Sequence, residues 1–108
     1  ALPELTKRLV ERELGAFCER RVPADVRSQV RLTFRVRGST VTLVEERAPR
    51  GEVGGWLESL IAQLRFDEEL AIWTLYCRDR SGRWIEYQAT RPSPKLGDVL
   101  AAVEQDLT

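Results

Sequence analysis

Residues 30–47 read V-R-L-T-F-R-V-R-G-S-T-V-T-L-V-E-E-R, and their apolar and polar side chains alternate as in a strand with one buried face. The apolar face would carry Leu32, Phe34 and Val36. The opposite face would carry Arg31, Thr33, Arg35 and Arg37. Gly38 and Ser39 break the alternation as a two-residue loop, and Gly in the first position suits a type II′ turn. The sequence therefore predicts a β-hairpin with one apolar face and one arginine-rich face.

Further elements are predicted on both sides of this hairpin. A helix is expected over residues 3–20, ending before Pro23, because the residue before a proline disfavours helical geometry. Strands are expected near 28–37 and 40–47, and then at 60–67, 72–78 and 83–87. A last helix would begin with Ser93 as its N-cap and Pro94 at its first position.

The order of these elements predicts the fold class. Short connections make consecutive strands antiparallel neighbours, so we expect one α+β domain over residues 1–108. It would consist of an N-terminal helix, a five-stranded antiparallel meander and a C-terminal helix, with both helices on one face of the sheet. The glycine-rich stretch 48–57 is predicted to be a loop with Trp56 as its anchor. Gly82 fits a type I turn with a G1 bulge.

Two finer predictions concern apolar side chains. The first helix carries a broad apolar arc, which predicts heavy burial against the sheet and a partner alike. The arc contains Leu2, Leu5, Leu9, Val10, Leu14, Ala16, Phe17 and Cys18. In the strand at 60–67, the apolar face is expected to carry Leu60, Ala62, Leu64 and Phe66.

Charge and composition limit the function classes. The 108 residues contain 17 basic and 17 acidic side chains, and this balance argues against a protein dedicated to nucleic acid. No stretch approaches the roughly 20 apolar residues of a membrane span, and the charged first residues are unlike a secretory signal. We therefore expect a cytoplasmic protein without a membrane partner, in which Cys18 and Cys77 are reduced, buried thiols.

The sequence contains few signs of catalysis. It has no histidine, which excludes Ser–His and Cys–His nucleophile pairs and removes a common metal ligand. Phosphate-binding loops, dinucleotide fingerprints and zinc-type cysteine spacings are also missing, so we expect neither a metal nor a cofactor. Glu45, beside Leu32 on the apolar face, could act as a general acid or base. The simpler interpretation is that Glu45 and Arg47 form ion pairs, either with each other or with a charge on a helix. Cys77 is expected among apolar neighbours.

Exposed aromatic side chains point to binding instead. Tyr76, Arg78 and Trp84 are predicted to project away from the helices, and such groups form both base-stacking platforms and protein hot spots. Stacking within the sheet beneath Arg78, or cover by the 48–57 loop, is an equally good explanation.

The arginines of the first hairpin strand form a second candidate surface. Arg31, Arg35 and Arg37, with Arg65 as a further candidate, could follow a phosphate backbone. A solvated strand face that Glu46 partly neutralises is the simpler account.

Three segments resemble a family of small bacterial proteins of unknown function. They are C-E-R-R-V-P at 18–23, E-E-R-A-P at 45–49 and W-T-L-Y-C-R-D-R-S-G-R-W-I-E-Y at 73–87. The resemblance implies a single-domain bacterial cytosolic protein and brings no activity or cofactor. Members of that family often carry Trp at the position of Cys77, which argues against a catalytic thiol there.

These observations lead to three hypotheses. The first is a non-catalytic binding module that uses Tyr76, Arg78 and Trp84 to hold a protein partner or a second copy of itself. The alternative is single-stranded nucleic-acid binding, with the arginines on phosphates and the rings on bases. An enzyme that uses Glu45 comes third. The first two require Tyr76 and Trp84 to lie clear of the helices.

Overall fold

The hairpin predicted from residues 30–47 is present in the computed structural model, which describes residues 1–49 and 54–107. Strands β1 (Val30–Arg37) and β2 (Thr40–Arg47) pair antiparallel. Val36 lies opposite Val41 and Phe34 opposite Leu43, so apolar residues share one face. Gly38 has a φ of +61°, a conformation that suits the first loop position of the predicted turn.

Three further strands extend this hairpin into one sheet. They are β3 (Leu57–Asp67), β4 (Ile72–Arg78) and β5 (Trp84–Glu86), and the strand order is β1-β2-β3-β4-β5 with every pair antiparallel. Gly82 has a φ of +81° in the last turn, and Cys77 lies opposite Ile85 as predicted. The sheet is therefore a meander in which each strand lies beside its neighbours in the chain.

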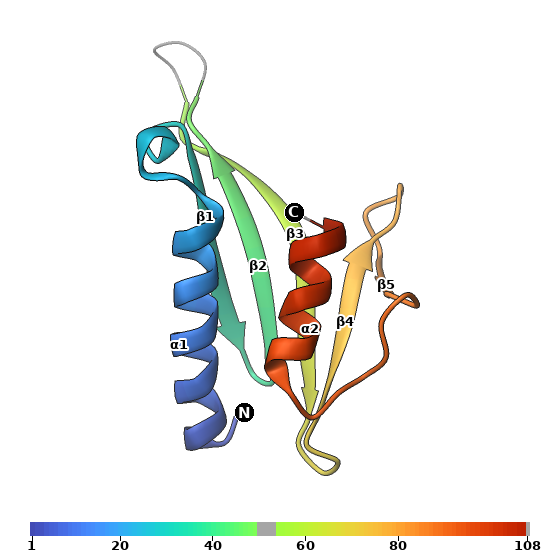
Figure 1. Cartoon of the computed structure of the whole chain (residues 1–108). Coiled ribbons are helices and arrows are strands. Elements are labelled where there is room, and N and C mark those ends of the chain that lie inside the picture. Colours follow the sequence, from blue (N-terminus) through green and yellow to red (C-terminus); the bar gives the residue numbers. More distant parts are fainter. Residues whose placement is uncertain (50–53, 108) are drawn as a thin grey trace.

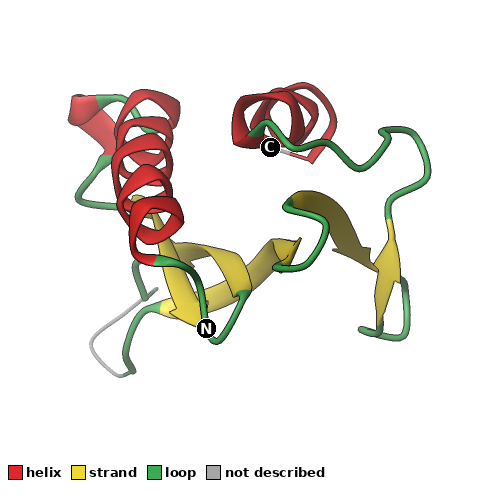
Figure 2. Cartoon of the chain, turned by 90° about the horizontal axis from the view of Figure 1, so that it is seen from below, coloured by secondary structure: helices red, strands yellow, loops and turns green. Residues whose placement is uncertain are grey.

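Both helices cover the same face of this sheet. Helix α1 (Glu4–Arg21) lies over β1, and α2 (Leu96–Ala102) lies over the β3–β4 side (Figures 1 and 2). A short 3₁₀ turn, η1 (Ala24–Val26), follows α1, and a π-helical turn, η2 (Val103–Leu107), continues α2. The predicted α+β fold is confirmed. No helix in the described part of the chain is long and apolar enough to cross a membrane.

The core lies between the two helices and the inner face of the sheet, the face with Leu32, Phe34 and Val36. Its fully buried side chains come from α1, from every central strand and from α2. They include Val10, Leu14, Phe17, Val41, Leu43, Ala62, Leu64, Trp73, Leu75, Leu96, Val99 and Val103. The Trp73 ring packs against Phe66 with 4.8 Å between ring centroids. Removal of these apolar surfaces from water is the main stabilising term for such a fold.

The apolar stripe of α1 is narrower than the sequence predicted. Val10, Leu14, Phe17 and Cys18 are buried, but Leu5 is 79% exposed and Ala16 also faces solvent. In the chain by itself, the sheet covers only one side of this helix, since one helix packed on one sheet face buries only one side. Burial of the other side against a partner stays a prediction.

The faces of β3 also differ from the predicted alternation. Leu43 lies opposite Ala62 but Val44 lies opposite Leu60, so Ile61 is the extra residue of a β-bulge. One extra residue in a strand moves each earlier residue of that strand to the opposite face of the sheet. Leu60 therefore lies on the face turned away from the helices, while Ile61 packs against the core.

The last helix begins later than predicted. Ser93 forms an isolated backbone bridge with Trp73, with N···O distances of 2.8 and 3.0 Å. Its hydroxyl accepts the Lys95 N–H and donates to Asp98. The bridge fixes the Ser93 backbone beside β4, and the helix begins only at Leu96 with Lys95 in the N-cap position. The prediction of Ser93 as the N-cap was therefore wrong.

The burial pattern predicts how two leucines respond to truncation. Leu64→Ala removes a fully buried side chain from the centre of the core and should lower the free energy of unfolding by about 2–4 kcal/mol. Leu70→Ala is the matched control, because Leu70 is 68% exposed, and its effect should stay within about 0.5 kcal/mol. Urea unfolding measures both. Equal effects would contradict the placement of the core.

Candidate binding surface

The face of the sheet turned away from the helices is called the outer face here. It comprises Arg31, Thr33, Arg35 and Arg37 of β1; Thr40, Thr42, Val44 and Glu46 of β2; Glu58, Leu60, Gln63, Arg65 and Asp67 of β3; Thr74, Tyr76 and Arg78 of β4; and Trp84 and Glu86 of β5. In the described structure both helices lie on the opposite side (Figure 2). Tyr76 and Trp84 are half-buried in the outer face and do not lie beneath a helix.

A row of side chains crosses the outer face from one strand to the next. Arg35 lies opposite Thr42, Thr42 opposite Gln63, and Gln63 opposite Tyr76. The Gln63 amide donates to the Thr42 hydroxyl at 3.2 Å. Arg65 donates to the Gln63 carbonyl oxygen at 2.9 and 3.1 Å. These bonds hold the polar side chains of the central strands in fixed positions.

Arginines stack on the aromatic rings of this face. The Arg65 guanidinium carbon lies 3.8 Å from the centroid of the Tyr76 ring, and that of Arg78 lies 5.8 Å from Trp84. Arg78 also donates two hydrogen bonds to the Gly82 carbonyl, at 3.0 and 3.1 Å. A guanidinium over an aromatic face contributes about 0.5–1 kcal/mol at exposed sites. These contacts hold each guanidinium group beside its aromatic ring within the folded chain.

The predicted trio of Tyr76, Arg78 and Trp84 is divided between two such stacks. Arg78 and Trp84 lie directly opposite each other on β4 and β5, whereas Tyr76 stacks with Arg65 of β3. The sequence did not single out that pair. Arg65 lies opposite Thr74, so it reaches Tyr76 only as a diagonal neighbour, and this relation depends on the β3–β4 register.

Trp56 has a role that the loop prediction missed. The Arg31 guanidinium carbon lies 3.6 Å from the centroid of the Trp56 ring. Arg31 also pairs with Glu46 at 3.7 Å, as the hairpin register predicts. The residue just before β3 thus stacks across the start of β1, two strands away.

The three arginines of β1 do not form a free basic stripe. Arg31 pairs with Glu46, and Arg35 pairs with Glu58 of β3. The Glu58 hydrogen bond and charge raise the pKa of Arg35 above its ordinary value. Arg37 is exposed, and no ion pair or hydrogen bond of its guanidinium is found within the described residues. Two of the three candidate phosphate ligands are therefore already neutralised.

The pair of Arg35 and Glu58 also covers an apolar spot. Val44 belongs to the outer face, yet it is 0% exposed. Val44 lies between Thr33 of β1 and Leu60 of β3, and the ion pair spans the same three strands. The pair therefore shields Val44 and Leu60 from water, and its methylene groups supply the cover.

Glu45 forms the ion pair expected from its position near a strand end. The Arg47 Nε donates to a Glu45 carboxylate oxygen at 2.7 Å. Glu45 lines none of the three cavities found around this end of β1 and β2. Among the described residues, no cluster of carboxylates and cysteines is arranged to hold a metal ion.

The two cysteines lie in different surroundings. Cys18 is buried on α1, and burial raises the pKa of its thiol to about 11. Cys77 faces the helices but is only half-buried, beside Ile85, which is 46% exposed. The prediction that both thiols are buried was therefore wrong for Cys77, because the helices leave the β4–β5 end of the inner face partly uncovered.

The turn beneath Arg78 predicts a strong dependence on Gly82. The φ of +81° at Gly82 is unfavourable for other residues. A Cβ there would also displace the flexible end of the Arg78 side chain, whose Nη2 would lie 2.5 Å away. Gly82→Ala should therefore lower the free energy of unfolding by about 1–2 kcal/mol. Gly97→Ala is the control, because its Cβ would meet nothing and the site is helical, so it should be neutral or stabilising. Urea unfolding of both variants tests this, and a neutral Gly82→Ala would contradict the turn geometry.

The raised pKa of Cys18 predicts slow alkylation. Only the thiolate reacts, and a pKa of about 11 instead of 9.0 lowers its population at pH 8 by about a hundredfold. In a Cys77→Ser variant, iodoacetamide should modify Cys18 of the folded protein at least that much more slowly than in the urea-unfolded chain. Mass spectrometry follows the reaction. Equal rates in the two states would disprove the burial of this thiol.

Comparison with known proteins identifies the family of this chain and gives no information about its activity. No curated protein and no solved structure matches the chain. The resemblance to a family of unknown function is confirmed. The model of the family described as domain of unknown function DUF3024 matches residues 2–108, and the chain therefore belongs to that family.

Proposed function

We propose that this protein is a non-catalytic binding module that holds a protein partner, or a second copy of itself, on the outer face of its sheet. The observation that carries the proposal is the set of arginine–aromatic stacks on a face that no described helix covers. Tyr76, Trp84 and Arg78 belong to the residue types that dominate binding energy at protein interfaces.

The fixed conformation of these side chains supports a role in binding. Immobilising a rotamer-rich side chain at an interface costs about 0.5–1.5 kcal/mol. Arg65 is held by the Tyr76 ring and by Gln63, and Arg78 by the Trp84 ring and the Gly82 carbonyl. Most of that cost is therefore met within the folded chain, and a partner need not order these groups.

The charge of the outer face favours a protein over a polyanion. Its basic residues are Arg31, Arg35, Arg37, Arg65 and Arg78. Its acidic residues are Glu46, Glu58, Asp67 and Glu86. Charges of both signs lie side by side, which suits a mixed protein surface. A phosphate backbone would meet carboxylates as often as arginines.

Single-stranded nucleic acid is the second candidate function. The arginines and the aromatic rings lie on the same face of the sheet, which supports this function. Against it, the guanidinium groups of Arg31 and Arg35 are paired with carboxylates, and the Tyr76 ring is covered by Arg65 on one side. A base would have to displace these contacts.

We also propose a cytoplasmic location. Cys18 and Cys77 are both free thiols, and a reducing compartment keeps thiols in that state.

The proposal predicts that Trp84 is needed for binding and Ile85 is not. Trp84→Ala removes a ring of the outer face, whereas Ile85→Ala changes the adjacent residue on the opposite face. Loss of a hot-spot ring costs about 2 kcal/mol, or roughly 30-fold in affinity. Light scattering over a range of protein concentrations measures self-association, and quantitative affinity purification from the source cell measures a partner.

Two controls keep this test informative. Circular dichroism should show that both variants fold, and anisotropy with a labelled oligothymidine at low salt tests the second candidate. A monomer at every concentration, combined with equal partner recovery by the wild type and Trp84→Ala, would contradict the proposal. Salt-dependent oligonucleotide binding that is lost in Trp84→Ala would favour the nucleic-acid alternative.

A further inference from the structure

A second surface lies at the free edge of β1, away from the outer-face stacks. We infer that β1 accepts an extended segment of a partner protein as an additional strand. The segment would carry acidic side chains at alternate positions, beside the arginines, and apolar side chains between them. This inference does not depend on the outer-face proposal.

The backbone of β1 is available for such pairing. β1 is the first strand in the sheet order. Arg37 and Thr40 flank the two-residue loop and form a hydrogen-bonded pair. At the other end, the Ala48 N–H bonds to the Gln29 carbonyl at 2.8 Å. The odd-numbered residues from 29 to 37 therefore bond to β2. The residues between these odd positions therefore direct their N–H and C=O groups away from β2. They are Val30, Leu32, Phe34 and Val36.

No other backbone hydrogen bond occupies this edge in the described chain. Outside the β1–β2 ladder, none reaches Leu32, Phe34 or Val36 within the described residues. Proteins protect edge strands by shortness, bulges, proline, charged side chains or a covering helix or loop. The charged side chains of β1 lie on its outer side and bear on the choice of partner. β1 has eight residues in continuous register and contains no proline.

The inner side of β1 is also incomplete. Leu32 and Phe34 are only partly buried, and Val36 is 37% exposed, whereas Val41 and Leu43 on the next strand are fully buried. An additional strand with apolar side chains on this side would cover the same three residues of β1.

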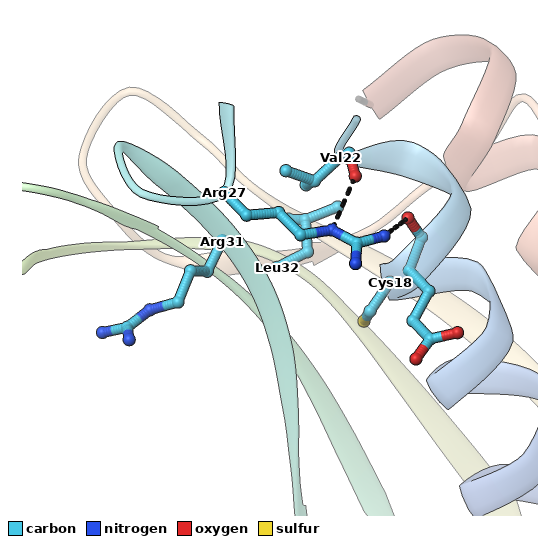
Figure 3. A pocket seen from close by; sticks show the side chains of 6 residues that line it. Cys18, Val22, Arg27, Arg31 and Leu32 are labelled. Carbon is cyan, nitrogen blue, oxygen red and sulfur yellow. Dashed lines mark hydrogen bonds between the residues drawn. The ribbon is translucent and has the colours of Figure 1, made fainter. Parts of the chain in front are cut away.

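A pocket lies where such an apolar side chain would point. It has a volume of about 230 Å³ and lies between β1 and the C-terminal end of α1, lined by Cys18, Glu19, Val22, Arg27, Arg31 and Leu32. In Figure 3, Leu32 and Cys18 point toward this space, and the Arg31 side chain points away from the helix.

Arg27 holds one wall of the pocket in place. Its guanidinium donates to the carbonyls of Val22 and Glu19 at 3.2 and 3.0 Å, which caps the end of α1. A strand edge beside a helix, with a pocket for an alternate side chain, is a recurrent way to bind an extended peptide.

The charges on β1 select the partner. Arg31, Arg35 and Arg37 project on the outer side, where the alternate side chains of an added strand would lie directly opposite them. A second copy of β1 fits poorly, because the antiparallel registers that pair most of the strand place Arg31 opposite Arg35 or Arg37 of that copy. Like charges directly opposite each other destabilise a sheet. Arg31 and Arg35 already pair with Glu46 and Glu58, so an acidic side chain would pair with Arg37, for which no ion pair is found within the described residues.

The test uses two synthetic peptides, EVELEVE and its basic counterpart KVKLKVK. Titration of the ¹⁵N-labelled protein should shift the amide signals of Leu32, Phe34 and Val36 with EVELEVE and leave them unchanged with KVKLKVK. A version of EVELEVE that is N-methylated at its valines and leucine should not bind, because those N–H groups would pair with β1.

A charge reversal separates this edge from the rest of the surface. Arg37→Glu should weaken EVELEVE binding by about tenfold and permit KVKLKVK to bind. Arg80→Glu is the matched control, since Arg80 is also exposed but lies in the β4–β5 turn, and it should leave the affinity for EVELEVE unchanged. The thermal transitions of both variants should match that of the wild type.

Several outcomes would overturn the inference. They are the absence of amide shifts at millimolar EVELEVE, equal binding of the two peptides, and shifts confined to Tyr76, Arg78 and Trp84. The last outcome would favour the outer-face proposal while rejecting the edge. Shifts at β1 alone would support the edge and would not bear on the outer-face proposal, which has its own test with Trp84→Ala.

Discussion

The register between β1 and β2 is the constraint on which the rest of the structure depends. Because side chains alternate strictly along a strand, pairing Phe34 with Leu43 places every apolar residue of β1 beneath the helices and every arginine on the other side. A slip by one residue would put Arg35 in the core. The cost of an unpaired buried charge makes that alternative inaccessible, and the two-residue loop at Gly38 enforces the observed register.

Once the faces are assigned, the same chain presents two chemically different surfaces that we propose for binding. The outer face carries stacked rings and cations, with carboxylates that reduce its net charge, and its side chains are ordered by contacts within the sheet. The edge of β1 instead presents backbone groups beside a small pocket at the end of α1. A face recognises a folded surface through its side chains, whereas an edge recognises an extended segment through its backbone.

Much of the fold could be predicted because it rests on local patterns. The turn residues Gly38 and Gly82 and the alternation around them were sufficient to predict the hairpin registers, including Cys77 opposite Ile85. The bulge at Ile61 could not be predicted, because the segment reads as a regular alternation and only pairing with Val44 reverses it. The late start of α2 likewise depends on the bridge between Ser93 and Trp73, which are distant in sequence.

The sequence by itself determined which side chains share a face, because the two-residue period of a strand is a property of the backbone. It determined in this way that Arg31, Arg35, Tyr76 and Trp84 would lie on the side opposite the helices. Only the tertiary structure decided which groups meet on that side, such as Arg65 with Tyr76 and Arg35 with Glu58. In each pair the two partners come from different strands, so their contact depends on distances that exist only after the sheet has formed.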